Sequence, residues 1–138
     1  MRTLFLLFSI LTLSVTAASA DNYLQSYPSG KRLFSYDGQY LKSYPSQKKL
    51  YEFDREKIKE YPSGKIIYKY EDGYIKAHPS GKKLLEFDGS HVKEYPSGKK
   101  ILEFKGQYLT LYPSGEKVME SSGILPRVLV SLIALGGL

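Results

Sequence analysis

A pairing of tyrosine with lysine recurs at fixed spacing and is the pattern in this sequence best suited to chemistry. The pentapeptide Tyr-Pro-Ser-Gly-Lys begins at Tyr27 and returns, with small variations, every 17 residues up to Tyr112. Aromatic rings and ammonium groups repeated at a fixed pitch predict a surface that binds a repeating anionic polymer or an acidic protein surface. The candidate binding residues are Tyr27, Lys31, Lys42, Tyr44, Lys48, Lys59, Tyr61, Lys65, Lys76, Lys82, Lys93, Tyr95, Lys99 and Tyr112. In the alternative interpretation, the lysines only make one face of the sheet solvent-exposed, and the neighbouring tyrosines cover the sheet surface.

The serines and histidines of the repeats stand at positions that indicate a structural rather than a catalytic role. Each pentapeptide carries one serine, but a hydrolase elbow needs Gly-x-Ser-x-Gly on a strand-to-helix turn with a histidine nearby. Both histidines of the chain stand where other repeats have tyrosine, His78 in the pentapeptide and His91 at the position of Tyr40. No third metal ligand is set by spacing. We therefore expect turn-forming serines, histidines that replace aromatic residues, no metal site and no cofactor.

Carboxylates also recur at one position of the repeat, at Glu52, Glu86, Glu103 and Glu120. They are interleaved with lysines, which is typical of cross-strand charge pairs. A glycosidase would need one acid in an apolar pocket and a second in a polar one, and nothing singles out two such acids. The absence of cysteine excludes a thiol nucleophile, a disulfide framework and a cysteine-ligated metal. We expect a protein that is not an enzyme.

Residues 1–20 have the pattern of a secretory signal peptide. Arg2 gives a positive start, an apolar run follows, and Ala18-Ser19-Ala20 fits the small-residue rule for cleavage after Ala20. The run is shorter than the ~20 residues that span a bilayer, and an uncleaved anchor helix is the alternative. The net charge is +6, and it falls to +5 when cleavage removes Arg2. This charge is modest, and acidic residues are interspersed among the lysines. We expect a secreted or periplasmic protein without a nucleic-acid partner.

Two turn signals divide each unit and define the strands that position these residues. Tyr-Pro-Ser-Gly-Lys is typical of a three-residue hairpin loop, a type I turn closed by a glycine bulge. Asp37-Gly38, with Asp72-Gly73 and Asp88-Gly89 as counterparts, suits a two-residue type I′ turn. The segments between the turns are rich in Tyr, Phe, Leu and Ile. The sequence thus predicts an all-β fold over residues 21–120, an antiparallel meander of about twelve short strands.

The same turns predict which residues face the core. A two-residue turn at Asp37-Gly38 pairs Phe34 with Leu41. Continued through the repeats, this register gives one apolar or aromatic row: Phe34, Leu41, Tyr51, Ile58, Tyr68, Ile75, Leu85, Val92, Leu102, Leu109 and Met119. The buried face also takes Tyr36, Phe53, Tyr70, Phe87 and Phe104, and the opposite, mixed face takes Leu33, Leu50, Ile67, Leu84, Ile101 and Val118. Because neighbouring strands twist by roughly 20–25°, such a sheet curls into a half-pipe or closes on itself.

The tandem Tyr-Pro-Ser-Gly-Lys hairpins over residues 23–120 resemble MORN-type repeats, especially the bacterial variant with Tyr-x-Asn-Gly-Lys turns that is described as antitoxin-like. The unit here is shorter than the family's, lacks its tryptophan and has serine at the asparagine position. The resemblance implies a curved antiparallel β-array that acts through protein or lipid contact rather than catalysis. No functional residue is carried over from it.

The apolar tail, residues 121–138, differs in character from the repeats. Pro126 suits the first turn of a short helix and Gly136 suits its end. A helix of ~10 residues is about 15 Å long, too short to cross a bilayer. The tail is expected to cap the repeat array or, since Arg127 is its only charge, to contact a membrane surface.

Two functional hypotheses follow from these observations. The first is a secreted or periplasmic binding or scaffolding module that meets its partner through a Tyr/Lys-lined sheet face. The alternative is a membrane-associated envelope protein held by its apolar tail and its lysines.

Overall fold

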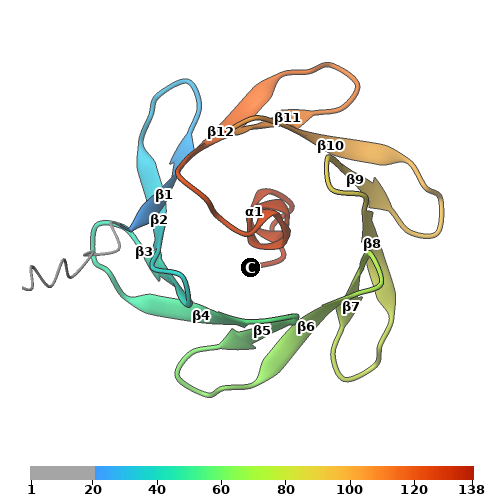
Figure 1. Ribbon diagram of the computed structural model, residues 1–138, viewed down its shortest axis with the longest axis horizontal. Coiled ribbons are helices and arrows are strands. Elements are labelled where there is room, and N and C mark those ends of the chain that lie inside the picture. Colours follow the sequence, from blue (N-terminus) through green and yellow to red (C-terminus); the bar gives the residue numbers. More distant parts are fainter. Residues whose placement is uncertain (1–20) are drawn as a thin grey trace, which may run out of the picture.

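The protein is a ring of twelve antiparallel strands with one helix inside it (Figure 1). The computed structural model describes residues 21–138, so the predicted signal peptide lies outside the described residues. The strands are β1 (Asn22–Ser26), β2 (Arg32–Tyr36), β3 (Tyr40–Ser43), β4 (Lys49–Asp54), β5 (Lys57–Glu60), β6 (Ile66–Glu71), β7 (Tyr74–Ala77), β8 (Lys83–Phe87), β9 (His91–Glu94), β10 (Lys100–Lys105), β11 (Tyr108–Leu111) and β12 (Lys117–Ser122). The helix α1 spans Arg127–Ala134. The predicted β meander with a short C-terminal helix is confirmed.

The sheet closes because its first and last strands pair with each other. Every strand pairs with its neighbours in sequence, and β1 pairs with β12 from Tyr23 opposite Ser122 to Ser26 opposite Met119. Of the two expected shapes, the half-pipe and the closed ring, the structure is therefore the closed one. Closure leaves no unpaired edge strand on which another chain could pair.

The Tyr-Pro-Ser-Gly-Lys segments form loops that point away from the barrel axis (Figure 1). In the first loop, the Gly30 amide donates to the Ser26 carbonyl and the Ser26 amide to the Lys31 carbonyl, both at 2.9 Å. Gly30 has the expected left-handed conformation, with a φ of 71°, and the six bonds that precede proline in these segments are cis. The loop holds four residues, so the predicted three-residue loop with a type I turn is wrong. Each turn serine accepts a hydrogen bond from the amide two residues on, which confirms its turn-forming role.

The strand register agrees with the prediction on one side of each strand and differs by two residues on the other. Leu41 lies opposite Tyr51, as expected, but opposite Tyr36 rather than Phe34 across the Asp37-Gly38 turn. The Asp37 Oδ1 accepts hydrogen bonds from two backbone amides of the turn, at 2.9 and 2.7 Å, and stabilises a loop of four residues. The same difference of two residues occurs in the hairpin of Lys105 and Tyr108, which has no carboxylate at this position, so the carboxylate is not its cause.

A two-residue turn of the predicted kind occurs at Asp72-Gly73, where φ is positive at both residues and Glu71 pairs with Tyr74. Counted by the 17-residue repeat, however, the counterpart of Asp37 is Glu71 and not Asp72. The two-residue shift recurs in the other hairpins of this kind. Repeated around the ring, it tilts the strands against the barrel axis, which a sheet needs in order to close.

Each Tyr-Pro hairpin contains a β-bulge with an apolar residue as its extra residue, and in three repeats this residue packs against the core. Leu41 pairs with Tyr51 and Lys42 with Lys49, which leaves Leu50 as the extra residue of β4. Register shifts recur at the same position in the other repeats. The bulge residues Ile67, Ile101 and Val118 pack against the core, so the prediction that they lie on the opposite face is wrong.

The core lies between the inner wall of the barrel and α1. Leu41, Ile58, Ile75, Val92 and Leu109 are fully or almost fully buried, which confirms the predicted buried face. A barrel of about eight strands is just wide enough to be filled by its own side chains, so a twelve-stranded one needs additional filling. Buried side chains of α1 supply it: Val128, Leu129, Val130 and Leu132.

Three polar contacts fix the tail within the barrel. The Asn22 side-chain amide donates to the Ile124 carbonyl at 2.6 Å, and the Tyr68 hydroxyl donates to the Gly137 carbonyl at 2.9 Å. The Arg127 guanidinium donates to the Gly89 carbonyl. Among residues 21–138, no helix combines the length and the apolar character needed to cross a membrane.

Candidate binding surface

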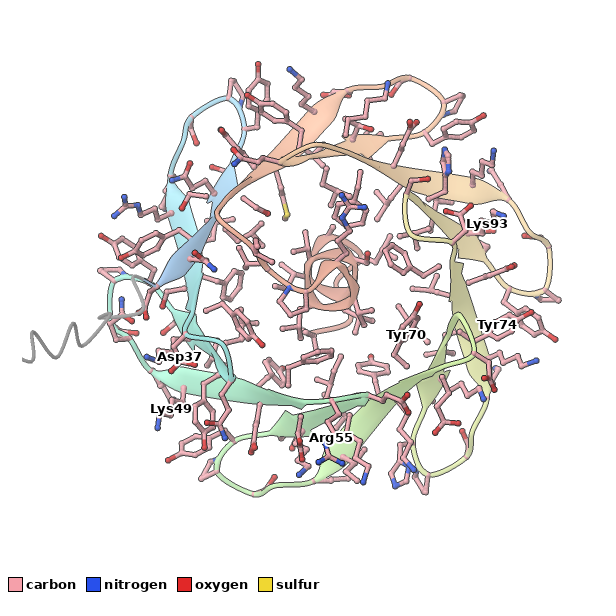
Figure 2. All side chains as sticks on the ribbon, in the orientation of Figure 1. Asp37, Lys49, Arg55, Tyr70, Tyr74 and Lys93 are labelled. Carbon is pink, nitrogen blue, oxygen red and sulfur yellow. The ribbon has the colours of Figure 1, made fainter. Side chains whose placement is uncertain are left out.

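The outer wall of the barrel carries pairs of aromatic rings, which we call the aromatic belt. Tyr40 and Tyr61 meet edge to face with their centroids 5.5 Å apart. The pair of Tyr27 and Tyr108, at 5.7 Å, spans the seam where the ring closes. The belt consists of the pairs Tyr23–Tyr44, Tyr40–Tyr61, Tyr74–Tyr95, His91–Tyr112 and Tyr108–Tyr27. Figure 2 shows Tyr74 and Lys49 outside the ring of strands and Tyr70 inside it.

A cation lies over each pair of the belt. Lys49 Nζ is 4.2 Å from the ring centroid of Tyr40 and 5.5 Å from that of Tyr61. The corresponding cations are Arg32 over Tyr23 and Tyr44, Lys83 over Tyr74 and Tyr95, Lys100 over Tyr112, and Lys117 over Tyr108 and Tyr27. Such contacts contribute about 0.5–1 kcal/mol each at exposed sites. They hold the tyrosines in place on the wall.

These cations are not the lysines that the sequence placed beside the tyrosines. The expected ones, which we call the turn lysines, are Lys31, Lys48, Lys65, Lys82 and Lys99. They are exposed in the loops and lie over no aromatic ring of residues 21–138. A signal for the belt cations exists in the sequence, because the residue after the turn lysine position is basic in five of six repeats.

The predicted tyrosines belong to the same Tyr-Pro segments as the turn lysines. Tyr27, Tyr61, Tyr95 and Tyr112 remain 39–44% exposed, and Tyr44 is half-buried. None of the turn lysines forms an ion pair with another residue of the described range. The loops therefore present uncompensated ammonium groups next to fixed, half-exposed rings.

One sector of the wall lacks the belt pattern. Lys57, Ile66 and His78 stand where the other repeats have an aromatic residue, a cation and a tyrosine. Within the described residues, Lys57, Ile66 and His78 take part in no aromatic pair and in no contact of a cation with a ring. The belt is therefore interrupted at one place in the ring.

The remaining predicted lysines, which we call the paired lysines, are engaged with acids. Lys42 Nζ lies 3.0 Å from Asp37 and 3.9 Å from Asp21. The same contact joins Lys59 to Asp54 at 3.1 Å, Lys76 to Glu71 at 3.5 Å and Lys93 to Asp88 at 3.4 Å. Burial alone would raise the pKa of Asp37, but hydrogen bonds from two backbone amides and from the Lys42 ammonium outweigh it and lower this pKa. The structure thus engages the paired lysines in ion pairs within the fold.

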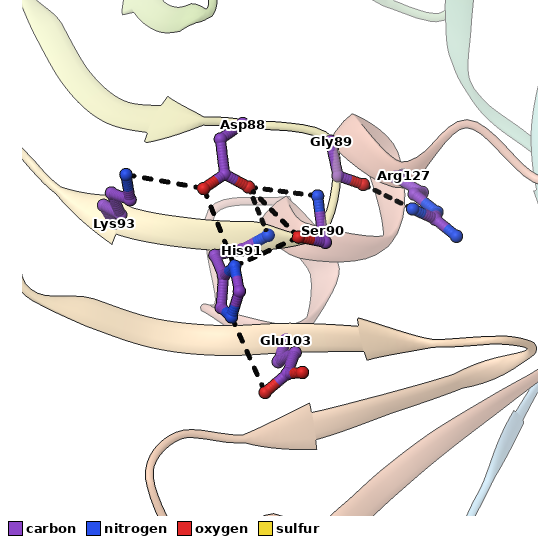
Figure 3. A network of polar contacts seen from close by, with 7 residues as sticks. All are labelled: Asp88, Gly89, Ser90, His91, Lys93, Glu103 and Arg127. Atoms are coloured by element: carbon purple, nitrogen blue, oxygen red, sulfur yellow. Dashed lines mark hydrogen bonds and ion pairs between the residues drawn. The ribbon is translucent and has the colours of Figure 1, made fainter.

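His91 belongs to a polar network at the start of β9 (Figure 3). Asp88 Oδ1 accepts hydrogen bonds from the amides of His91 and Ser90, at 2.7 and 3.1 Å. These bonds, that from His91 foremost, and the nearby Lys93 ammonium lower the pKa of Asp88 to about 2. The imidazole lies 3.6 Å from Asp88 and 3.7 Å from Glu103. Its edge-to-face contact with Tyr112 confirms its role as an aromatic substitute.

The repeated glutamates occupy cross-strand positions, with Glu52 opposite Lys59 and Glu86 opposite Lys93. Glu103 lies opposite Thr110 and Glu120 opposite Gln25, and within residues 21–138 none of the four glutamates forms an ion pair with a lysine. The predicted neighbourhood of acid and lysine therefore holds for Glu52 and Glu86 only, and the lysines form their ion pairs with other acids. In the part of the chain that the structure describes, no group of three or more histidine or acidic side chains is arranged to hold a metal ion.

A comparison with family models finds no match to this chain, and neither the curated proteins nor the solved structures match it significantly. The resemblance to MORN-type repeats stays a prediction.

Proposed function

We propose that this protein is a secreted or periplasmic module that binds an anionic polymer of the cell envelope through the Tyr/Lys-lined outer wall of its barrel. The module acts as a scaffold rather than an enzyme and needs no cofactor or nucleic-acid partner. An acidic protein surface offers the same charges with less regular spacing and is the second partner to consider.

The proposal rests on the turn lysines. They are exposed and without acid partners in residues 21–138, whereas the paired lysines are compensated by carboxylates. A positive charge that is not compensated within the fold is available to an external anion. The single observation that carries the proposal is this separation of the lysines into a compensated and an uncompensated set.

The ring repeats this arrangement at regular spacing. Equivalent residues of adjacent repeats are two strands apart, or about 9–10 Å on the wall. One polymer chain can therefore contact several loops at once, and linked contacts raise the overall affinity far above that of one loop. The half-exposed tyrosines beside the turn lysines supply apolar surface for the polymer backbone.

The alternative of an envelope protein held to lipid by its tail is less well supported. Val128, Leu129 and Leu132 are buried inside the barrel and so are not available to a membrane. Contact with anionic lipid through the turn lysines alone would need no tail. Such lipid contact would give binding to anionic vesicles that weakens with salt. A variant without the tail would still bind these vesicles.

The test compares two variants in a binding assay with immobilised poly(glycerol phosphate). In the first, all five turn lysines are changed to Gln; in the second, the four paired lysines Lys42, Lys59, Lys76 and Lys93 are changed to Gln. The first variant is expected to lose at least about tenfold in affinity, because linked contacts are lost together. The second is expected to lose clearly less.

The two variants remove similar amounts of charge, five units against four, so net charge alone predicts similar losses. Equal losses would show that the protein is attracted by its overall charge and has no site on the loops. Circular dichroism and the melting temperature of each variant check that the barrel is intact.

A further inference from the structure

A cavity of about 270 Å³ opens between α1 and the ends of β10, β11 and β12. Phe104 of β10, Gln107 of the β10–β11 turn and Ser121 of β12 contribute to its wall, and Ile124 and Leu125 close it from the tail side. It is separate from the aromatic belt, which lies on the outer wall. The mouths of β-barrels are common places for small-molecule sites.

The lining of this cavity combines apolar side chains with a few polar ones. Phe104, Leu125 and Val130 are buried and belong to the core around the helix. Ile124 is 87% exposed at the edge of the cavity. The apolar part of a ligand placed here would cover it.

Arg127 is the one charged residue among the described residues that line the cavity. Its guanidinium donates to the Gly89 carbonyl and lies 5.0 Å from the ring centroid of Phe104. A guanidinium has five N–H donors, and this one makes no other hydrogen bond within residues 21–138. The remaining donors suit a carboxylate, which arginine can bind through two parallel hydrogen bonds.

The residues around the cavity are held in place before any ligand arrives. The Asn22 side chain fixes the Ile124 carbonyl at 2.6 Å, and the Gly89 carbonyl holds the guanidinium. Gly123 brings the chain so close to Asn22 that a Cβ there would lie 2.1 Å from its Oδ1. A preformed site avoids much of the ordering cost of binding.

We propose that this cavity binds a small carboxylate with a short apolar chain, with the carboxylate on Arg127 and the chain between Phe104, Leu125 and Ile124. A water molecule occupies about 30 Å³ in the liquid, so the cavity takes a ligand of roughly eight to ten non-hydrogen atoms. Hexanoate has this size and this chemistry. The site does not depend on polymer binding by the outer wall.

The experiment is an NMR titration of the protein with hexanoate, acetate and hexanol. Hexanoate is expected to shift the amide signals of Gly106, Gln107 and Ser121 with a saturable curve. Acetate lacks the apolar chain and hexanol lacks the charge, so each is expected to bind at least about tenfold more weakly. Equal binding of hexanol and hexanoate would overturn the assignment of the carboxylate to Arg127.

Two matched variants complete the test. Arg127→Gln is expected to weaken hexanoate binding by about 10- to 100-fold, the worth of a charge-assisted contact. Arg55→Gln is the control, because Arg55 stands at the repeat position of Gly106 in another sector and lines no part of this cavity. The proposal is overturned if hexanoate shifts no signals at the cavity, or if folded Arg127→Gln binds it as the unmodified protein does.

Discussion

Gly123 is the residue at which the chain leaves the barrel wall and turns toward the interior. Its φ is 92°, and a Cβ there would meet the Asn22 side chain at 2.1 Å. Gly123→Ala is therefore expected to combine the left-handed cost of about 1–2 kcal/mol with a clash that disturbs the contact of Asn22 with Ile124. The unfolding free energy in urea measures the loss.

Gly115→Ala is the matched control for this prediction. Gly115 also has a positive φ, 75°, but no atom lies within 4 Å of its Cβ position. It is expected to show the backbone cost alone, so the loss at Gly123 is the larger by roughly 1–3 kcal/mol, the usual range for overpacking. Equal losses would contradict the close approach between Gly123 and Asn22.

Leu129 lies at the centre of the barrel with no exposed surface. Leu129→Ala is expected to cost about 2–5 kcal/mol, because it removes buried methyl groups and leaves a cavity that the strands cannot collapse to fill. Leu135→Ala, near the end of the same helix at 42% exposure, is the control and is expected to cost well under half as much. Chemical denaturation measures both. Similar small losses would mean that α1 does not fill the barrel in solution.

At the scale of the elements, the turn at Asp88 makes the stability of the barrel depend on pH in the acidic range. The pKa of Asp88 is about 2 in the folded protein, against about 3.9 in an unfolded chain. A carboxyl whose pKa is lowered by folding stabilises the fold above its unfolded pKa. This stabilisation is lost as the pH falls from about 4 through about 2.

The variant Asp88→Asn isolates this effect, because an amide oxygen can still accept the two backbone hydrogen bonds of the turn. The protein is expected to melt at a higher temperature than the variant at about pH 5, and the difference is expected to shrink toward about pH 2. Groups that titrate elsewhere in the barrel, and the neighbours His91, Lys93 and Glu103, are common to both proteins. A difference in melting temperature that stays constant with pH would contradict the role of the charge.

The elements also show which parts of the fold the repeat could predict. The pairing of Leu41 with Tyr51 was predictable, because that hairpin keeps the inner residues opposite each other even with one more loop residue and a bulge. The pairing across Asp37-Gly38 was not, since an Asp-Gly pair alone does not fix which residues the two strands pair beside it. The same shift occurs at Lys105 and Tyr108, where no Asp-Gly pair is present. A shift of two residues does not change the face on which a paired side chain lies, which is why the buried face was right. The bulge residues Ile67, Ile101 and Val118 are the exception, because a bulge changes the face by one residue.

The place of α1 could not be read from its own sequence. An apolar helix with one charge fits a lumen, a groove or a membrane surface equally well. Only closure of the ring creates an interior that twelve strands do not fill, and closure depends on the two-residue stagger that was missed. The position of the tail therefore depends on the strand register, and an error in the register hides the place of the helix.

At the scale of the whole molecule, the repeat produces a wall with two kinds of lysine. The set of lysines was predictable from the spacing, but their division was not. It depends on which acid lies beside each lysine, and in one repeat the counterpart of Asp37 was misplaced by one residue, at Asp72 instead of Glu71. The belt cations were missed because the turn lysine was taken as the partner of the tyrosine, whereas the next residue faces the rings.

The central claim is that the outer wall binds an anionic polymer through its turn lysines. The most direct measurement is the affinity of the unmodified protein for poly(glycerol phosphate) as a function of salt, with an uncharged polymer of similar length beside it. We expect tight binding at low salt, a steep fall as salt screens the exposed ammonium groups, and no binding to the uncharged polymer. Absence of binding at any salt, or binding that salt does not change, would contradict it.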